Sequence, residues 1–255
     1  MERELVTSRA NPLLARVRKL NSRRAFRREE NAFAAEGLKL LGEALRWGAE
    51  LEAVIAAPGV SLPELPRGVR LVEVPDSLLA SIADTETPQG VVFVCRGKPL
   101  ALPSALEGGR YLILDGVQDP GNVGTIWRAA DAFGAEGLIL CSGCADPWNP
   151  KTVRATMGAV FRLPVYECAL EAAAEGLERA GLPLYATALR EDTEDVRRVD
   201  LGRGAVIIGS EGRGVSREAL SLCGRTIKIP MSPRCESLNA AVAASVILWE
   251  MARND

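Results

Sequence analysis

Apolar residues follow helical and strand spacing in turn along the chain, and the first half of this pattern predicts a small α/β domain. The ranges 12–20 and 37–47 carry apolar residues at helical spacing, and Asn11 followed by Pro12 is a typical helix start. Strands are predicted at 51–56, 69–74 and 90–94, with a short helix at 77–82 between the last two. Together these elements make an N-terminal domain of about a hundred residues.

The second half alternates more regularly. Strands are predicted at 111–114, 138–141, 163–166, 184–188, 206–208 and 226–229, and helical segments follow most of them. Short apolar strands separated by helices favour a parallel sheet covered on both faces. Two prolines in the stretch 97–103 mark a linker between the halves. We therefore expect a domain at 1–97, a linker at 98–107 and a second domain at 108–255.

Composition removes several classes of function. The 255 residues include no histidine, so Ser-His-Asp triads, HExxH metalloproteases and histidine general bases are all excluded. No apolar run is long enough to span a bilayer and no signal peptide is recognisable, so no membrane association and a cytoplasmic location are expected. Six scattered cysteines favour reduced thiols. The pair Cys141 and Cys144 leaves a zinc or redox motif open, but a single CxxC predicts no metal site.

Charge is unevenly distributed although the net charge is only −2. Residues 1–31 contain nine basic and four acidic side chains, a surplus of five positive charges, whereas residues 32–255 carry a net −7. Such a segment can contact phosphates, and Arg23, Arg24, Arg27 and Arg28 are the candidate contacts. The alternative is a solvated helix with ordinary surface ion pairs.

Three segments of the second half place glycine or small polar residues after an apolar run. They contain Asn122-x-Gly124-x-x-x-Arg128, Gly209-x-Glu211-x-x-Gly214 and Glu236-Ser-Leu-Asn239. Glycine at a strand end lets a ligand approach the backbone, so the three loops predict one shared site. No G-x-G-x-x-G follows the strand at 111–114 and the chain has no Walker A motif, which disfavours a dinucleotide-dependent oxidoreductase and a P-loop enzyme.

In this order, the three motifs resemble those of the SpoU (TrmH-like) branch of the SPOUT RNA 2′-O-methyltransferases. The resemblance implies a C-terminal parallel-sheet α/β domain with a deep trefoil knot, S-adenosylmethionine as methyl donor, a ribose 2′-hydroxyl as acceptor, and a homodimer that completes the site across its interface. The stretches 8–12 and 33–37 resemble the RNA-binding domain of rRNA-modifying members. Ribosomal RNA is therefore the expected substrate. A tRNA methyltransferase and a non-catalytic RNA-binding or ribosome-assembly protein remain alternatives.

The resemblance also assigns roles to individual residues. Three loops would hold the cofactor mainly through backbone groups, and the residues assigned to it are Thr187, Ala188, Leu189, Gly209, Glu211, Gly212, Ile229, Met231 and Leu238. Taken singly, each of these residues is also compatible with an ordinary core or turn position. The residues assigned to catalysis are Arg128, Asn122, Glu211, Ser237 and Asn239.

Physical chemistry limits what some of these residues can do. Arg128 is expected to bind substrate phosphate and stabilise the developing alkoxide, because arginine is a poor proton acceptor in proteins. The alternative for Arg128 is a surface pair with Asp131. Glu211 is expected to hold either Arg128 or the loops, and Ser237 to cap the last helix. Gly209 would let the main chain approach the ribose.

Two features near the C-terminal end bear on the shape of the site and on the dimer interface. The range 232–235 reads Ser-Pro-Arg-Cys where the family often has glycine, so this turn is expected to differ in shape. The last helix carries an apolar stripe that fits either a dimer interface or intramolecular core, and it comprises Ala240, Val242, Ala243, Val246, Ile247 and Met251.

Overall fold

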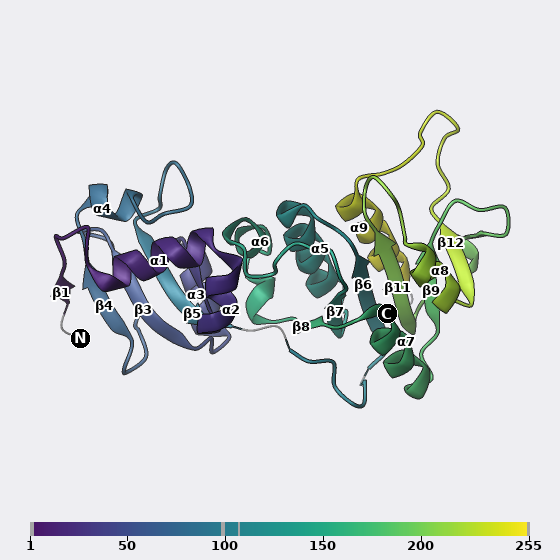
Figure 1. Cartoon of the computed structure of the whole chain (residues 1–255), viewed down its shortest axis with the longest axis horizontal. Helices are drawn as coiled ribbons and strands as arrows, with labels where there is room; N and C mark the ends of the chain where they lie inside the picture. Colours follow the sequence, from purple (N-terminus) through teal and green to yellow (C-terminus); the bar gives the residue numbers. More distant parts are fainter. Residues whose placement is uncertain (1–2, 98–99, 107, 254–255) are drawn as a thin grey trace. The chain divides into compact units, whose positions relative to one another are not determined.

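The computed structural model describes residues 3–97, 100–106 and 108–253, and the chain forms two compact units (Figure 1). The first unit contains Met1–Lys98 and Trp148–Phe161, and the second contains Pro99–Pro147 and Arg162–Asp255. Part of the predicted linker, at residues 98–99 and 107, lies outside the described residues. No pattern in the sequence indicated that residues 148–161 belong to the first unit.

The first unit is built on a five-stranded mixed sheet. Its order is β1 (Glu4–Leu5), β4 (Arg70–Glu73), β3 (Leu51–Ala56), β5 (Val91–Arg96) and β2 (Ala32–Glu36), and β5 runs antiparallel to both of its neighbours. The strand pattern predicted β3, β4 and β5. It missed β1, which has only two residues, and β2, whose alanines carry little strand signal.

Helices α1 (Pro12–Ser22) and α4 (Asp76–Ala80) pack on the sheet through a common apolar cluster. The Asn11 side chain accepts a hydrogen bond from the amide of Leu13 at 2.9 Å and Pro12 occupies the first helical position, as the sequence predicted. Two further helices, α2 (Arg24–Glu30) and α3 (Leu38–Arg46), precede and follow β2. The sequence predicted α3 but not the seven-residue α2.

Residues 148–161 add α6 (Pro150–Ala155) and a short 3-10 helix, η1 (Ala159–Phe161), to this unit. Side chains alternate between the two faces of β2, so Phe33 points away from the face to which Ala32 and Ala34 contribute. The Trp148 ring stacks on Phe33 with 4.7 Å between centroids and a 16° interplanar angle, and Phe161 lies 6.3 Å from Phe33. Trp148 thus covers the outer face of β2.

Trp148→Ala is expected to destabilise the first unit by about 3–5 kcal/mol, the usual cost of truncating a buried tryptophan. The indole is 6% exposed and its removal uncovers Phe33, itself 1% exposed. Urea unfolding followed by circular dichroism measures the change in the free energy of unfolding. Trp47→Ala is the matched control, because Trp47 is 50% exposed. Equal effects of the two substitutions would show that the Trp148–Phe33 contact contributes little.

The second unit is built on a seven-stranded sheet whose paired strands all run parallel, as the alternating pattern predicted. Its order is β10 (Glu194–Asp195), β12 (Arg225–Lys228), β9 (Leu184–Thr187), β11 (Gly204–Gly209), β6 (Arg110–Asp115), β7 (Gly137–Leu140) and β8 (Val165–Glu167). Only the two-residue β10 was not predicted.

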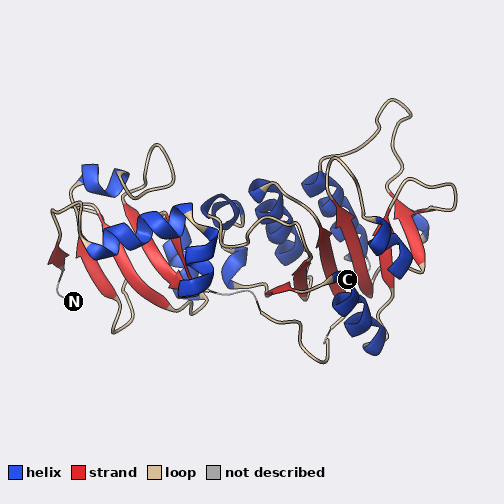
Figure 2. Ribbon diagram, in the orientation of Figure 1, coloured by secondary structure: helices blue, strands red, loops and turns tan. Residues whose placement is uncertain are grey.

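Helices cover both faces of this sheet (Figure 2). Helices α7 (Leu170–Arg179) and α8 (Arg217–Leu222) share an apolar cluster with residues of β6, β7 and β11. Helices α5 (Pro120–Ala132) and α9 (Ala240–Met251) pack against each other, with α9 also in contact with β11. None of the helices in the described ranges has both the length and the apolar character to cross a membrane.

Candidate active site

A cavity of about 470 Å³ lies beyond the carboxyl ends of β9, β11 and β12 in the second unit. Parallel α/β sheets bind ligands at this end because the loops that follow neighbouring strands converge there. Eight of the nine residues assigned to the cofactor line its wall, namely Thr187, Ala188, Leu189, Gly209, Glu211, Ile229, Met231 and Leu238. Gly212, the ninth, does not line it.

The sequence missed much of the remaining wall. The wall also contains apolar side chains, charged side chains and two alanines of α9. These residues are Ile208, Val215, Leu220, Ile227, Arg190, Arg213, Lys228, Ala240 and Ala243. Most of these positions adjoin a predicted loop by one to a few residues. A search that extended each loop into its flanking strand and helix would have found them.

Gly209 is required by the loop that follows β11. Ser210 and Gly214 form a reciprocal pair of backbone hydrogen bonds, of 3.1 and 2.8 Å, which folds the loop back on itself. A Cβ atom on Gly209 would lie 2.1 Å from the carbonyl carbon of Gly214 and 2.2 Å from the amide nitrogen of Val215. The loop thus gives this glycine a steric reason, and the expected approach of the main chain to the ribose stays a prediction.

Three side chains join the three motifs. The side-chain amide of Asn122 donates a hydrogen bond to the Glu211 carboxylate and accepts one from Asn239 Nδ2 at 3.1 Å. Asn122 lies in the first turn of α5, because Asp119 caps that helix by accepting from the Asn122 amide at 2.9 Å. Of the two roles left open for Glu211, the structure shows the one in which it holds the loops together.

The N-cap of the last helix is Asn239, and the expectation that Ser237 caps it was wrong. Asn239 Oδ1 accepts from the amides of Ala241 and Val242 at 2.9 and 3.3 Å, so the helix begins two residues later than expected. Ser237 instead lies exposed on the cavity wall. The unusual 232–235 stretch forms a tight turn, with the Cys235 amide donating to the Ser232 carbonyl at 2.9 Å.

Arg128 lies exposed on α5, away from the cavity wall and from the Asn122 hydrogen bonds. It has no hydrogen bond or ion pair to any other described residue. The alternative pairing with Asp131 is wrong, because Asp131 binds Arg162 through contacts of 2.7 and 2.8 Å. Arg128 follows Asn122 by six residues, which is about 9 Å along a helix axis. In a single copy of the chain, Arg128 does not line the cavity.

Both cysteines of the CxxC pair are buried. Burial raises the pKa of Cys144 to about 11, and it raises the pKa of Cys141 as well. The Cys144 thiol also donates to the Leu114 carbonyl at 3.2 Å. Because metal binding and thiol exchange both require the thiolate, these cysteines are poorly suited to either role at neutral pH. Within the described ranges, no cluster of three or more potential metal ligands occurs.

Comparison with known proteins agrees with this geometry. Residues 109–249 match the SpoU rRNA methylase family, and residues 11–92 match the MRM3-like substrate binding domain. The chain belongs to the SpoU rRNA methylase family. The resemblance inferred from the three motifs is thereby confirmed, and so is the α/β fold with a parallel-sheet domain. The SpoU match includes all five residues assigned to catalysis.

Relatives of this SpoU-family chain are similar over nearly its full length. It is 31% identical to the 23S rRNA (guanosine(2553)-2'-O)-methyltransferase RlmP of Bacillus subtilis, covering 96% of this chain and 98% of RlmP. The AdoMet-bound rRNA methyltransferase from Sinorhizobium meliloti is 34% identical with a TM-score of 0.88, and 98% of each chain is covered. The SpoU methyltransferase AviRb from Streptomyces viridochromogenes, in complex with AdoMet, is 29% identical with a TM-score of 0.84, covering 96% of this chain and 98% of AviRb.

Proposed function

We propose that this SpoU-family protein transfers a methyl group from S-adenosylmethionine to a ribose 2′-hydroxyl of ribosomal RNA. The observation that carries the proposal is the 470 Å³ cavity at the ends of β9, β11 and β12. Beside it, Glu211 and Asn239 both form hydrogen bonds with the Asn122 side chain. Full-length relatives act on rRNA at the 2′-oxygen, and similar structures contain AdoMet. A folded C-terminal knot, as the family implies, is part of the proposal.

The cavity wall suits S-adenosylmethionine. Apolar side chains such as Ile229 and Leu238 can pack on a flat adenine ring, while backbone groups of the converging loops meet its edge. The Glu211 carboxylate lies on the same wall and can favour a positively charged ligand. When bound, the cofactor supplies a methyl group already activated by its sulfonium charge. The Asn122 hydrogen bonds hold the three loops in the arrangement that forms the wall.

Arg128 would act on the RNA rather than on the cofactor. Its planar guanidinium can bind a phosphate bidentately and stabilise negative charge on the attacking 2′-oxygen. The proton of the hydroxyl then leaves to a phosphate or to water. Because Arg128 does not line the cavity of its own chain, we propose that it completes the site of a second copy.

The surface formed by α5 and α9 supports a homodimer. The apolar stripe of α9 contains both buried and exposed residues. Ile247 and Met251 are buried in the core, whereas Val242 and Val246 are 50% and 37% exposed. Trp249, which is 62% exposed, and the edge of α5 extend this apolar surface as far as Asn122 and Asn239. An exposed apolar surface beside the site fits an interface with a second copy, whose α5 would carry Arg128 toward the cavity. A cytoplasmic location also remains part of the proposal.

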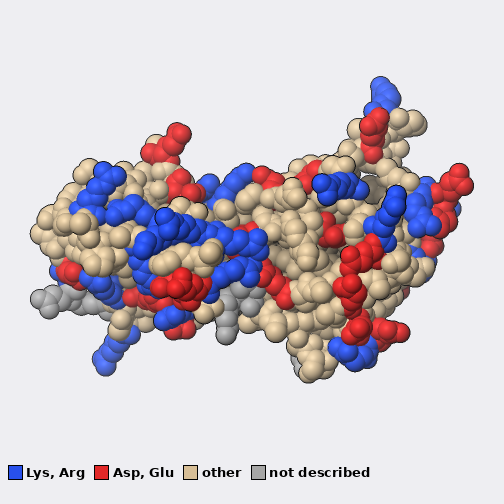
Figure 3. Space-filling view, viewed as in Figure 1, with Lys and Arg blue, Asp and Glu red and all other residues tan. Residues whose placement is uncertain are grey.

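The first unit presents the basic surface expected for RNA binding. Figure 3 shows Lys and Arg side chains gathered over α1 and α2. Exposed members of this group are Lys19, Arg23, Arg24 and Arg28. Arg27 is different, because it is 3% exposed and donates to the carbonyls of Leu20 and Asn21 at 2.6 and 3.4 Å. Arg27 therefore stabilises the α1–α2 turn, and the prediction that it contacts phosphate was wrong.

Replacing Arg23, Arg24 and Arg28 together by glutamine is expected to weaken RNA binding and flatten its salt dependence. The log–log slope should fall by at most about 0.9 for each phosphate that the protein no longer neutralises. Filter binding at several salt concentrations measures both quantities. The control replaces Arg67, Arg179 and Arg253, three exposed arginines elsewhere on the chain, by glutamine. If both triple variants behave alike, the effect is one of net charge and the α1–α2 surface is an ordinary solvated face.

The function itself is tested by offering the purified protein tritiated S-adenosylmethionine with ribosomal RNA or with tRNA. We expect label in ribosomal RNA, at a ribose 2′-oxygen identified by alkaline-resistance mapping, and calorimetric binding of S-adenosylhomocysteine but not of NAD. Label in tRNA alone would establish the alternative substrate. RNA binding without methyl transfer, under conditions where S-adenosylmethionine is bound, would indicate the non-catalytic alternative.

A further inference from the structure

The first unit has a cavity of its own, of about 280 Å³. Its wall is contributed by the end of β2 with the first turn of α3, by the loop 84–90, and by α6 with the turn that follows it. The side chains that matter below are Lys39, Thr87, Gln89, Arg154 and Met157. Nothing in the proposed transfer reaction accounts for this cavity.

Met157 on this wall is held in an unfavourable backbone conformation. Its φ is 50°, and among the described residues only Asn31 shares a positive φ without being glycine. The left-handed region costs about 1–2 kcal/mol for such a residue. The turn is fixed by the fully buried Thr156, whose hydroxyl donates to the Val153 carbonyl at 2.7 Å and accepts from the Gly158 amide at 3.4 Å. The consequence is an apolar thioether that is 41% exposed in the cavity wall. Strain of this kind is concentrated at ligand-binding positions.

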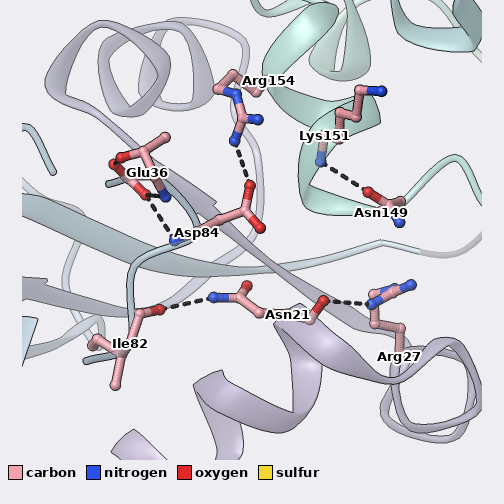
Figure 4. Close-up of polar contacts among 9 residues, drawn as sticks. Asn21, Arg27, Glu36, Ile82, Asp84, Asn149, Lys151 and Arg154 are labelled. Atoms are coloured by element: carbon pink, nitrogen blue, oxygen red, sulfur yellow. Dashed lines mark hydrogen bonds and ion pairs between the residues drawn. The ribbon is translucent and has the colours of Figure 1, made fainter. Parts of the chain in front are cut away.

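The opposite wall is equally fixed. The Glu36 carboxylate accepts from the amides of Asp84 and Thr85 at 3.1 and 3.3 Å and from the Thr85 hydroxyl, while Arg154 binds the Asp84 carboxylate (Figure 4). Just before this loop, the Asn21 side chain donates to the Ile82 carbonyl at 2.7 Å. Side chains of α1, β2 and α6 thus hold the loop 84–90 and the residues just before it in place without a ligand.

Two polar side chains on this loop remain available to a ligand. Thr87 and Gln89 are exposed on the cavity wall, and neither forms a hydrogen bond within the described part of the chain. A side-chain amide and a hydroxyl offer both donors and acceptors, as the edge of a nucleobase requires. Gly37 closes the wall beside Gln89, because a Cβ on Gly37 would lie 3.0 Å from Gln89 Oε1.

Positive charge lies at the same cavity. Lys39 is exposed in the first turn of α3 and has no ion-pair partner among the described residues, and Arg154 keeps 47% of its side chain exposed despite its bond to Asp84. The first turn of α3 has no side-chain cap, so its amides add to the favourable potential for an anion. Glu43 lies one helical turn after Lys39 on α3 and Glu36 lies on the same wall, so these two carboxylates reduce the positive potential beside Lys39.

We propose that this cavity binds one unpaired nucleotide of the RNA substrate. The base packs on the Met157 thioether with its edge toward Thr87 and Gln89, and the phosphate lies toward Lys39 and Arg154. Unpaired nucleotides are recognised in this way, by a contact with the base face and hydrogen bonds to its edge. The inference rests on the proposed function as an RNA methyltransferase. Since Met157 and Arg154 lie in the SpoU match and the rest of the wall in the MRM3-like match, neither region alone forms the cavity.

The decisive variant is Met157→Gly, which removes the side chain and at the same time relieves the left-handed strain, so folding should not suffer. With the full chain and a large-subunit ribosomal RNA transcript, we expect the KM for RNA to rise roughly tenfold, because the base no longer packs on a side chain. The kcat and the affinity for S-adenosylhomocysteine should stay unchanged.

Two further variants test the polar contacts. Gln89→Ala should also raise the KM for RNA, and Lys39→Gln should raise it and reduce the slope of log affinity against log salt concentration by up to about 0.9. Leu5→Ala, at a 68% exposed residue of β1, is the control.

Photocrosslinking locates the bound nucleotide directly. RNA that contains 4-thiouridine should crosslink to the peptide containing Met157 in the unmodified protein, and the crosslink should disappear in the Gln89→Ala variant. An unchanged KM in both Met157→Gly and Gln89→Ala, or tight binding of free uridine 5′-monophosphate that RNA does not displace, would overturn the proposal. If the protein methylates no RNA, only the proposed function fails. The dissociation constants of the protein–RNA complexes and the crosslinks then still decide whether the cavity binds a nucleotide.

Discussion

Arg128→Ala is expected to lower the rate of methyl transfer by about a thousandfold, because one positioned charge that stabilises a developing oxyanion contributes on this scale. S-adenosylhomocysteine should bind as in the unmodified protein, since Arg128 does not line the 470 Å³ cavity. Arg128→Lys should fail as well, because a point ammonium does not reproduce the planar, bidentate guanidinium. Single-turnover transfer measured with saturating RNA, together with calorimetry, separates the two quantities. Near-normal rates in the lysine variant would contradict this role.

The same variant tests the proposed homodimer. Sedimentation should give twice the 27.3 kDa mass of one chain, and a monomer that still methylates RNA would disprove the dimer. Suppose that Arg128 of one copy completes the cavity of the other. A mixture of the Arg128→Ala protein with a variant that cannot bind the cofactor, such as Gly209→Ala, should then recover activity, because some mixed dimers contain one intact site. No recovery after verified subunit exchange would place Arg128 in the site of its own chain.

Gly209→Ala is expected to weaken the binding of S-adenosylhomocysteine by about a hundredfold or more, since overpacking against fixed backbone must displace the loop. The added Cβ meets backbone atoms of Gly214 and Val215 at 2.1 and 2.2 Å, and neither can move away as a flexible side chain would. The reciprocal Ser210–Gly214 hydrogen bonds would then be broken, and with them the wall that carries Glu211. Isothermal titration calorimetry measures the weakening.

Gly212→Ala provides a control three residues along the same loop. A Cβ at Gly212 meets no atom within 4 Å, and its φ lies outside the left-handed region that disfavours alanine. Cofactor binding should therefore be retained in this variant, with circular dichroism showing that both proteins remain folded. Equally weakened binding in the two variants would mean that the loop tolerates no side chain anywhere, and the close approach of Gly209 to Gly214 would have no special importance.

The sequence by itself determined most of the strands and helices of both units, the order of the motifs and the end of the sheet at which they lie. Apolar strands separated by helices require a parallel sheet, and a parallel sheet gathers its loops at the carboxyl ends of the strands. For this reason the motif loops after β6, β11 and β12 could be assigned to one site before any contact was known, whereas the loop after β9 was assigned through the family resemblance. Ile229 and Leu238 were assigned through the same resemblance, and both line the cavity.

Only the tertiary structure decided which residues meet. Asn122 and Glu211 are 89 residues apart, and either could have formed a local turn instead of the hydrogen bond that joins them. The glycine at 209 resembles any turn glycine until the position of Gly214 is known. Likewise, the apolar Trp148 could have packed on either unit, and only its stack on Phe33 assigns it to the first. Local spacing fixes the periodicity of each element, whereas these contacts depend on the approach of segments distant in the chain, for which one sequence contains no signal.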